Sequence, residues 1–321
     1  MEHIEGPACV RDMIGQIGPR GKLARMASHA KGRGVPMRHT ALIGPGGTGK
    51  TKLARMVAEL MDAPFREVTA GSVRSMPDMT AALRRIEPDM IFFVDEWHRV
   101  APMTLDQVIY PALSDRVIYV ATDGEPQRVV LPPFTLIAAT THARFDPSMA
   151  RRFKTIVLDY YSVAELTEII IRAARGLEPD PFTISPDAAL YLAQRSQGVA
   201  GVAQQLLADA VDETSGEDVI TLAHTVKAME RSEVDALGLG KQERKILEAV
   251  AEECGRPIGI ESIKAITGER EIDEQVAFLT RMRLMRLAKG RQGRVATVAA
   301  YAHLGWDHVP PMVRGMENDQ R

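Results

Sequence analysis

Short apolar runs alternate with stretches of helical spacing over the first half of the chain. Thr40 to Ile43 is one such run, and Leu53 to Leu60 then carries apolar residues at helical spacing. Met90 to Val94 and Phe134 to Ala139 are longer apolar runs, which predict fully buried strands. Strands that alternate with helices predict an α/β fold with a parallel sheet, and its ligand is expected at the carboxyl ends of the strands.

The same patterns predict further elements around these strands. They are strands at Pro64–Val68 and Thr155–Leu158, helices at Arg20–Lys31, Met79–Ile86 and Thr104–Leu113, and a β-hairpin at Val117–Val130 that turns at Asp123-Gly124. All of these elements belong to one large domain, which we expect to span residues 1–159.

The strand signal ends near residue 160, and a small helical domain is expected from there to residue 236. Its helices carry apolar stripes, and Ser162 and Ser185 are suitable N-cap residues for the first two. The helices are predicted at Val163–Arg175, Pro186–Arg195 and Val202–Asp212. No strand is expected in this part of the chain.

A third domain is predicted over residues 237–308. Its helices are expected at Lys241–Glu253, Ile260–Ile266 and Ile272–Arg281, and two short strands at Leu284–Ala288 and Arg294–Val298. Three helices followed by a two-stranded wing predict a winged helix. The polar segment from Trp306 to Arg321, of which residues 309–321 form the tail, is expected to be mobile.

The stretch Arg281–Arg294 contains six Lys or Arg residues and no acid. Lys289, Arg291 and Arg294 belong to the expected wing, where cations suit contacts to DNA phosphates. A winged helix that binds another protein is the alternative, and the charge run favours DNA. A second basic stretch, Met13–Arg38, is expected to be the solvated face of a helix.

Composition narrows the class of protein. Of the 321 residues 45% are hydrophobic and 26% charged, with a net charge of −2, which is ordinary for a globular protein. No apolar run approaches the length of a membrane span, and the acidic start Met1–Glu5 is not a signal peptide, so a cytoplasmic location is expected. Cys9 and Cys254 are too few for a disulfide framework or the usual zinc site.

A glycine-rich loop joins the first buried strand to its helix. Its glycines let the backbone N–H groups point at an anion, Lys50 adds a cation for the outer phosphates, and Thr51 adds a hydroxyl for Mg²⁺. A chance match in a glycine-rich turn is the alternative, but the strand before and the helix after favour a nucleoside triphosphate site. The residues expected to bind it are Gly44, Gly46, Gly47, Thr48, Gly49, Lys50 and Thr51.

Polar residues follow two of the buried strands. Asp95 and Glu96 are costly to desolvate unless a cation or water lies nearby, so Asp95 is expected to bind Mg²⁺ and Glu96 to polarise the attacking water. Thr141 is placed to sense the γ-phosphate. Arg152 can reach the nucleotide of a neighbouring subunit. Each residue has a structural alternative. Asp95 and Glu96 could simply open a loop, Thr141 could start a turn, and Arg152 could be a surface charge.

These motifs resemble those of the RuvB family, AAA+ motors that drive branch migration of Holliday junctions. The matching segments are Met13–Gln16, the glycine-rich loop, Asp95–Arg99, Tyr110–Ala112, Leu131–Thr141, Arg152-Phe153, Arg294–Thr297 and His303–Gly305. The resemblance implies that Lys50 and Thr51 bind triphosphate and Mg²⁺, that Asp95 and Glu96 are the Walker B pair, that Thr141 is sensor 1, that Arg152 is the arginine finger, and that Tyr161 lies near the adenine.

The resemblance also implies an architecture and partners. The architecture is an AAA+ P-loop ATPase domain, a small helical lid domain and a winged helix. The partners are ATP, Mg²⁺, duplex or branched DNA, further copies of the chain in a ring that we expect to be a hexamer, and a RuvA-like or other protein. No membrane partner is expected.

The chain departs from the family pattern at three places. Gly201 stands where the family has the sensor 2 arginine, and Gly6 and Met13 stand where it has an arginine and a tyrosine near the adenine. The hairpin that binds RuvA is shorter here, and Tyr119–Gly124 lacks its usual apolar tip.

Two functions fit these features. The first is a DNA motor that hydrolyses ATP at subunit interfaces. The second is a switch that assembles on DNA with ATP, positions a partner protein and hydrolyses ATP slowly. The Walker B pair and Arg152 favour the motor, whereas Gly201 favours the switch.

Overall fold

In a computed structural model of the protein, the described residues are 10, 12–73, 75–122, 125–141, 151–177, 181–288 and 293–318. They form two compact units. One contains residues up to 165 together with 199–201, and the other contains 166–198 and the residues from 202 onward. Within the described ranges, no helix is long and apolar enough to cross a membrane.

Five parallel strands form the central sheet of the first unit, in the order β2-β3-β6-β1-β7. The strands are β1 (Thr40–Ile43), β2 (Phe65–Thr69), β3 (Ile91–Asp95), β6 (Thr135–Thr140) and β7 (Lys154–Val157). The predicted parallel sheet is therefore confirmed, with each strand within one residue of its expected bounds.

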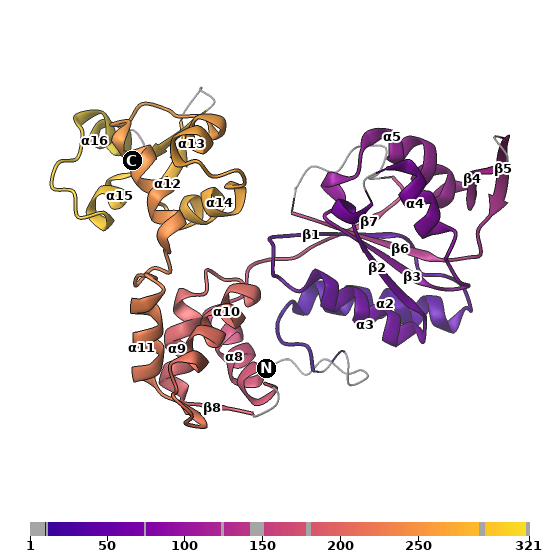
Figure 1. Ribbon diagram of the computed structural model, residues 1–321, viewed down its shortest axis with the longest axis horizontal. Helices are drawn as coiled ribbons and strands as arrows, with labels where there is room; N and C mark the ends of the chain where they lie inside the picture. The colour runs from indigo at the N-terminus through magenta and orange to yellow at the C-terminus, as the bar shows by residue number, and fades with distance from the viewer. Residues whose placement is uncertain are drawn as a thin grey trace. The chain divides into compact units, whose positions relative to one another are not determined.

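Helices cover both faces of this sheet (Figure 1). They are α2 (Ile17–Gly32), α3 (Lys50–Met61), α4 (Met76–Leu83), α5 (Pro102–Thr104), the π-helical turn η3 (Leu105–Ile109) and α6 (Tyr110–Ser114). Phe93 packs in the cluster that contains α2 and α3, whereas its neighbour Phe92 packs in the cluster that contains α4. Both side chains are fully buried, which contributes about 1.5–3 kcal/mol each.

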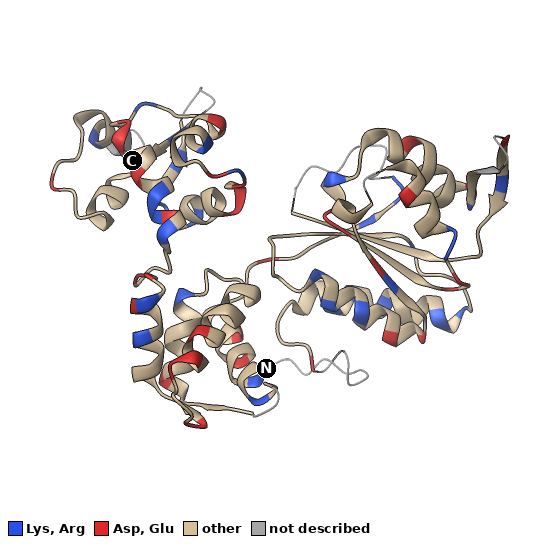
Figure 2. Ribbon diagram, viewed as in Figure 1, with Lys and Arg blue, Asp and Glu red and all other residues tan. Residues whose placement is uncertain are grey.

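The basic helix α2 carries Lys and Arg residues and no acid (Figure 2). Lys22, Arg25 and Lys31 are exposed, as expected of a solvated face. Arg20 is different, because only 6% of its surface is exposed. The prediction of a uniformly solvated basic face is therefore wrong at Arg20, which lies on the side of α2 that faces the protein.

The helix α4 differs from the predicted Met79–Ile86 helix. It begins at Met76, because Ser75 and Asp78 form a capping box. In this box the Asp78 N–H donates to Ser75 Oγ (3.3 Å) and the Ser75 N–H donates to Asp78 Oδ2 (3.1 Å). The helix ends at Leu83, three residues before its expected end.

The helix predicted over Thr104–Leu113 is interrupted by η3. Pro111 has no N–H with which to continue the i→i−4 hydrogen bonds, and a wider π-turn precedes it. The hairpin that follows is confirmed, with β4 (Val117–Thr122) antiparallel to β5 (Glu125–Val130). Its turn, Asp123-Gly124, lies outside the described residues.

His39 precedes β1 in an apolar setting. Its ring centroid lies 5.5 Å from that of Phe134, and its Nδ1 accepts the Leu136 N–H at 2.9 Å. Burial lowers the pKa of His39 to about 4, although a hydrogen bond with the Leu113 backbone opposes this shift. The folded protein therefore holds His39 neutral.

We expect this histidine to make stability depend on pH. The unfolded chain binds a proton below about pH 6.5 and the folded chain only below about pH 4, so stability is lost as the pH falls through that window. The loss is about 3 kcal/mol. Urea unfolding at pH 7 and pH 4 measures it, and His39→Asn, which keeps an acceptor for Leu136, should reduce the difference. An equal loss in both proteins would contradict the assignment.

The small helical domain contains α8 (Val163–Arg175), α9 (Pro186–Arg195), α10 (Ala200–Asp212) and α11 (Leu222–Arg231). Ser162 caps α8, since its Oγ accepts the Glu165 N–H at 3.2 Å, but Ser185 makes no side-chain cap of α9. The prediction that this part has no strand is wrong. β8 (Thr183–Ile184) pairs in parallel with β9 (Val219–Ile220), and two-residue strands are too short to give an alternating pattern.

The five elements predicted for the third domain are present in the expected order. They are α12 (Lys241–Glu252), α13 (Ile260–Thr267), α14 (Asp273–Arg281) and the antiparallel pair β10 (Met285–Leu287) and β11 (Arg294–Ala296). β11 ends earlier than expected because Thr297 caps a further helix, α15 (Val298–His303), by accepting the Ala300 N–H.

The prediction of a mobile tail is wrong as far as residue 318, and residues 319–321 lie outside the described residues. α16 (Pro311–Asn318) lies within this tail, and Val313, 1% exposed, packs in the same core cluster as α12 and α14. Trp306 packs its ring edge-on against Tyr301, with centroids 5.9 Å apart. Three apolar residues in an eight-residue helix, Met312, Val313 and Met316, were too weak a signal to predict it.

Candidate nucleotide site

The strand order brings the predicted motifs to one edge of the sheet. β6 lies between β1 and β3, and its register pairs Thr140 with Ile43 and Ala138 with Val94. Because all three strands are parallel, the glycine-rich loop after β1, Thr141 after β6, and the acids at the end of β3 emerge at the same edge.

Glycine is required at several positions of the loop. Gly47 and Gly49 have positive φ angles of 63° and 90°, which other residues rarely adopt. A Cβ atom on Gly44 would lie 2.9 Å from the Leu158 carbonyl oxygen, and the Gly44 N–H donates to the Thr140 carbonyl at 3.1 Å. The start of the loop therefore packs closely against Leu158 and Thr140. The loop leads directly into the N-terminus of α3, where anions bind favourably.

Lys50 is the buried cation of this loop, with 8% of its surface exposed. Its Nζ donates to the carbonyl oxygens of Gly44 (2.9 Å) and Pro45 (2.7 Å). Thr48 Oγ1 also donates to the Pro45 carbonyl, at 2.7 Å. Lys50 Nζ therefore lies at the centre of the loop. The phosphate oxygens of a bound nucleotide would take the place of these two carbonyl oxygens.

The acidic pair occupies the end of β3. Asp95 Oδ1 accepts the Glu96 N–H at 2.8 Å. Glu96 has a φ of 52°, a left-handed conformation that costs about 1–3 kcal/mol in a non-glycine residue. Trp97, which follows Glu96, is 5% exposed and packs its ring edge-on against Phe153. This packing holds the chain in place directly after Glu96. Arg99 lies 3.6 Å from Glu96 Oε2 in an exposed and therefore weak ion pair.

Thr141 and Arg152 lie on segments that follow the sheet. Thr141 is exposed, directly after the buried Thr140. Arg152 is half-buried: its Nε donates to Ser114 Oγ at 3.3 Å, and its guanidinium lies 4.7 Å from the Tyr110 ring centroid. Within its own subunit Arg152 is thus held by α6. Its role in a neighbouring site stays a prediction.

Tyr161 contacts the loop directly. Its hydroxyl donates to the Thr48 carbonyl at 3.0 Å, and its ring is 7% exposed. Burial, together with the Glu165 carboxylate, raises the pKa of Tyr161 to about 12, so the phenol remains a neutral donor. Nothing in the local pattern predicted a bond between residues 113 positions apart.

Residues 13–16 complete this side of the site. A Cβ atom on Gly15 would lie 2.7 Å from the Tyr161 ring, and Met13 lies close to Gly49. Gln16 Nε2 donates to the Asp159 carbonyl at 2.6 Å. Residue-level reasoning gave these positions no role, and only the family resemblance marked them. Gly6, the other departure near the adenine, lies outside the described residues.

Gly201 approaches the loop with its backbone. Its N–H donates to the Gly47 carbonyl at 3.3 Å, and a Cβ atom on Gly47 would lie 2.7 Å from Val199 Cγ1. The position predicted to have lost the sensor 2 arginine therefore lies beside the phosphate loop, which it contacts through its backbone amide.

The predicted DNA-binding residues are only partly described. Arg294, on β11, is half-buried, and burial lowers its pKa. Lys289 and Arg291 lie outside the described residues. Arg281, at the start of the basic run, donates to the Gln197 carbonyl. This contact is structural, so the run supplies fewer cations for DNA than its composition indicates.

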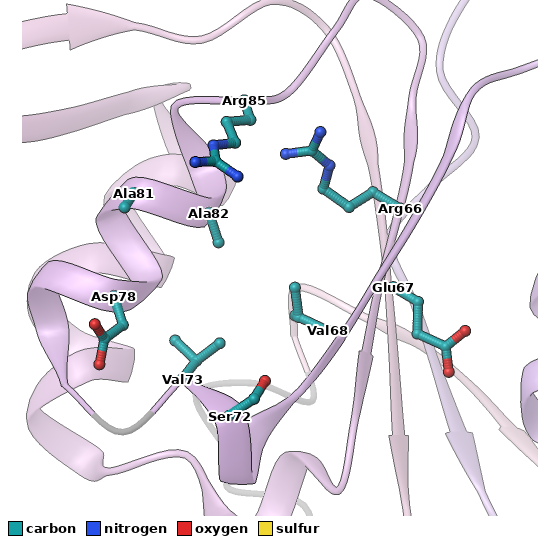
Figure 3. Close-up of a pocket in the computed structure, with 9 residues that line it drawn as sticks. All are labelled: Arg66, Glu67, Val68, Ser72, Val73, Asp78, Ala81, Ala82 and Arg85. Atoms are coloured by element: carbon teal, nitrogen blue, oxygen red, sulfur yellow. The ribbon is translucent and has the colours of Figure 1, made fainter.

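A separate cleft of about 380 Å³ lies between β2 and α4 (Figure 3). Arg66 extends from β2 toward α4, Arg85 lies at the end of α4, and Val68 and Ala82 line the wall of the cleft. None of the predicted nucleotide-binding or DNA-binding residues lines this cleft.

Comparisons with known proteins agree over most of the chain. The family model of the Holliday junction DNA helicase RuvB P-loop domain matches residues 6–157, and that of the RuvB AAA lid domain matches residues 161–235. RuvB of the Holliday junction branch migration complex from two strains of Streptococcus thermophilus is 35% identical over 312 residues, which cover 94% of this chain and 92% of the relative.

Solved structures give the same result. A P216G mutant of Thermotoga maritima RuvB is similar with a TM-score of 0.84 and 30% identity, over 94% of this chain and 99% of that one. The T. maritima RuvB branch migration motor is similar with a TM-score of 0.80, over 92% and 96% of the two chains. The FIGL-1 AAA domain, at 17% identity and a TM-score of 0.53, shares only the fold.

Proposed function

The chain belongs to the RuvB family, and from this premise we propose that it is an ATP-hydrolysing motor that drives branch migration of Holliday junctions. One observation carries the proposal. β6 separates β1 from β3, so the phosphate loop, Thr141 and the pair Asp95–Glu96 share one edge of the sheet. A phosphoryl-transfer site needs these groups together.

The residues at this edge fit a nucleotide with its metal ion. The left-handed Gly47 and Gly49 shape the loop, and Lys50 is a buried cation within it. Thr51 and Asp95 would hold Mg²⁺, which when bound offsets the negative charge of the phosphates. Oxygen ligands of this kind are the ones that Mg²⁺ prefers.

The remaining residues have distinct roles in the proposed reaction. Glu96 accepts a hydrogen bond from the attacking water and polarises it. Thr141 donates a hydrogen bond to the γ-phosphate. Arg152 leaves Tyr110 and Ser114 and stabilises the charge that develops on the phosphoryl group of a neighbouring subunit.

This shared site requires an assembly of several copies. We propose a hexameric ring around duplex or branched DNA, with Lys289, Arg291 and Arg294 directed at the DNA phosphates. A RuvA-like protein would bind the β4–β5 hairpin, on which Tyr119 and Val130 are 55% and 59% exposed.

A switch with slow hydrolysis is the second candidate, and Gly201 favours it. Its N–H donates to the Gly47 carbonyl, so it offers the nucleotide no cation from this position. One charge-assisted contact of about 1.5–3 kcal/mol is then missing from the ATP-bound form.

We expect the two candidates to separate in one assay. ATP turnover is measured alone, with duplex DNA and with a four-way junction, and migration of the junction is followed in parallel. A motor should turn over faster with DNA and move the junction, whereas Lys50→Ala should do neither. ATP-dependent DNA binding with slow turnover and no migration would favour the switch, and failure to bind ATP would refute both.

A further inference from the structure

Arg20 is a buried cation to which the described residues offer no side-chain hydrogen bond and no ion pair. Its Nε is buried and makes no hydrogen bond, and no ion pair involves Arg20 among the residues that the structure describes. Its helix, α2, contains no acidic residue that could pair with it at helical spacing. An unpaired buried charge is unfavourable, and the same burial lowers the pKa of Arg20.

Arg20 follows Gly15 and Gln16, which lie against Tyr161 and Asp159. Tyr161 opposes the lowering of the Arg20 pKa, and the Tyr161 hydroxyl donates to the Thr48 carbonyl at 3.0 Å. The Arg20 N–H donates to the Gln16 carbonyl at 2.8 Å, and the Gln16 side chain is bound to the Asp159 backbone. The first turn of α2 is thus fastened to the segment that carries Tyr161, which keeps Arg20 at this side of the loop.

The position of Tyr161 indicates which part of the nucleotide is near. Tyr161 bonds to Thr48, next to the N-terminus of α3, where backbone N–H groups hold the α- and β-phosphates. Lys50 serves the outer phosphates from the other end of the loop. A cation beside Tyr161 is therefore close to the part that ATP and ADP share.

We infer that Arg20 is a nucleotide-binding residue whose guanidinium donates hydrogen bonds to the nucleoside or α-phosphate portion of bound ATP and ADP. The inference rests on the proposed function and adds a contact to its site. It explains the buried charge, because a charged hydrogen bond formed on binding offsets a cost that the nucleotide-free protein carries.

The test measures two quantities in the full-length Arg20→Met protein. Affinity for Mg-ATP and Mg-ADP should fall about 10- to 100-fold, by the same factor for both nucleotides. The melting temperature of the nucleotide-free protein should stay the same or rise, because an unpaired buried charge is removed. Arg20→Lys should recover part of the affinity, and Arg25→Met, an exposed arginine on the same helix, should change neither quantity.

Three results would overturn the inference. The first is an Arg20→Met protein whose nucleotide affinity is within twofold of the wild type. The second is a melting temperature lowered by several degrees, which marks a structural arginine. The third is a loss of affinity confined to ATP, which places Arg20 at the γ-phosphate. ATP binding by the wild type with no Arg20 effect overturns this inference alone. No nucleotide binding by the wild type overturns the proposed function as well.

Discussion

Replacing Arg152 by alanine is expected to lower the ATPase rate of the assembled protein by about 10³- to 10⁵-fold. The reason is that an arginine supplied by a neighbour stabilises charge that exists only in the transition state, so nucleotide affinity should change little. Arg151→Ala is the matched control, since Arg151 is exposed and adjacent. Its rate should stay close to the wild-type value.

Subunit mixing shows whether Arg152 acts in a neighbouring site. Arg152→Ala subunits keep an intact phosphate loop, and Lys50→Ala subunits keep an intact Arg152. A mixture should recover part of the activity, because some interfaces combine both intact halves. The wild-type contacts of Arg152 are with Tyr110 and Ser114 of its own subunit. If co-assembled mixtures show no recovery, Arg152 acts within its own subunit or not at all.

Glu96→Gln is expected to slow ATP hydrolysis by about 10²- to 10⁴-fold while ATP binding is retained. The amide has the shape of the carboxylate but cannot accept the proton of the attacking water. Glu96 has a strained left-handed backbone conformation. Glutamine has a side chain of the same length, so the substitution should leave this conformation unchanged. Glu87→Gln, an exposed glutamate before β3, is the control and should leave the rate unchanged.

Lys50→Ala should instead abolish binding itself. Lys50 is the buried cation of the loop, and without it the loop offers the outer phosphates no charged side chain. One titration of fluorescent ATP, followed by a turnover assay on the same samples, separates the two variants. Wild-type hydrolysis in Glu96→Gln would remove Glu96 from the mechanism, and tight binding by Lys50→Ala would show that the loop does not hold the triphosphate.

Local sequence was sufficient for the five strands of the central sheet, for most helices and for the glycine-rich loop. Buried strands require unbroken apolar runs, and left-handed turns such as those at Gly47 and Gly49 require glycine, so both leave a short-range signal. The same reasoning failed for elements that depend on polar hydrogen bonds, that are only two residues long, or that contain few apolar residues. The capping box at Ser75, the two-residue strands β8 and β9, and the docked helix α16 are the examples.

Tertiary structure alone decided how the residues of the site are arranged. Sequence placed Asp95, Thr141 and the phosphate loop each after a strand, but only the order β3-β6-β1 made them neighbours. The bond from Tyr161 to Thr48 and the burial of Arg20 join segments far apart in the chain. Such contacts depend on how helices and strands pack, which no local pattern encodes, whereas the residues that make each element possible are fixed by the sequence itself.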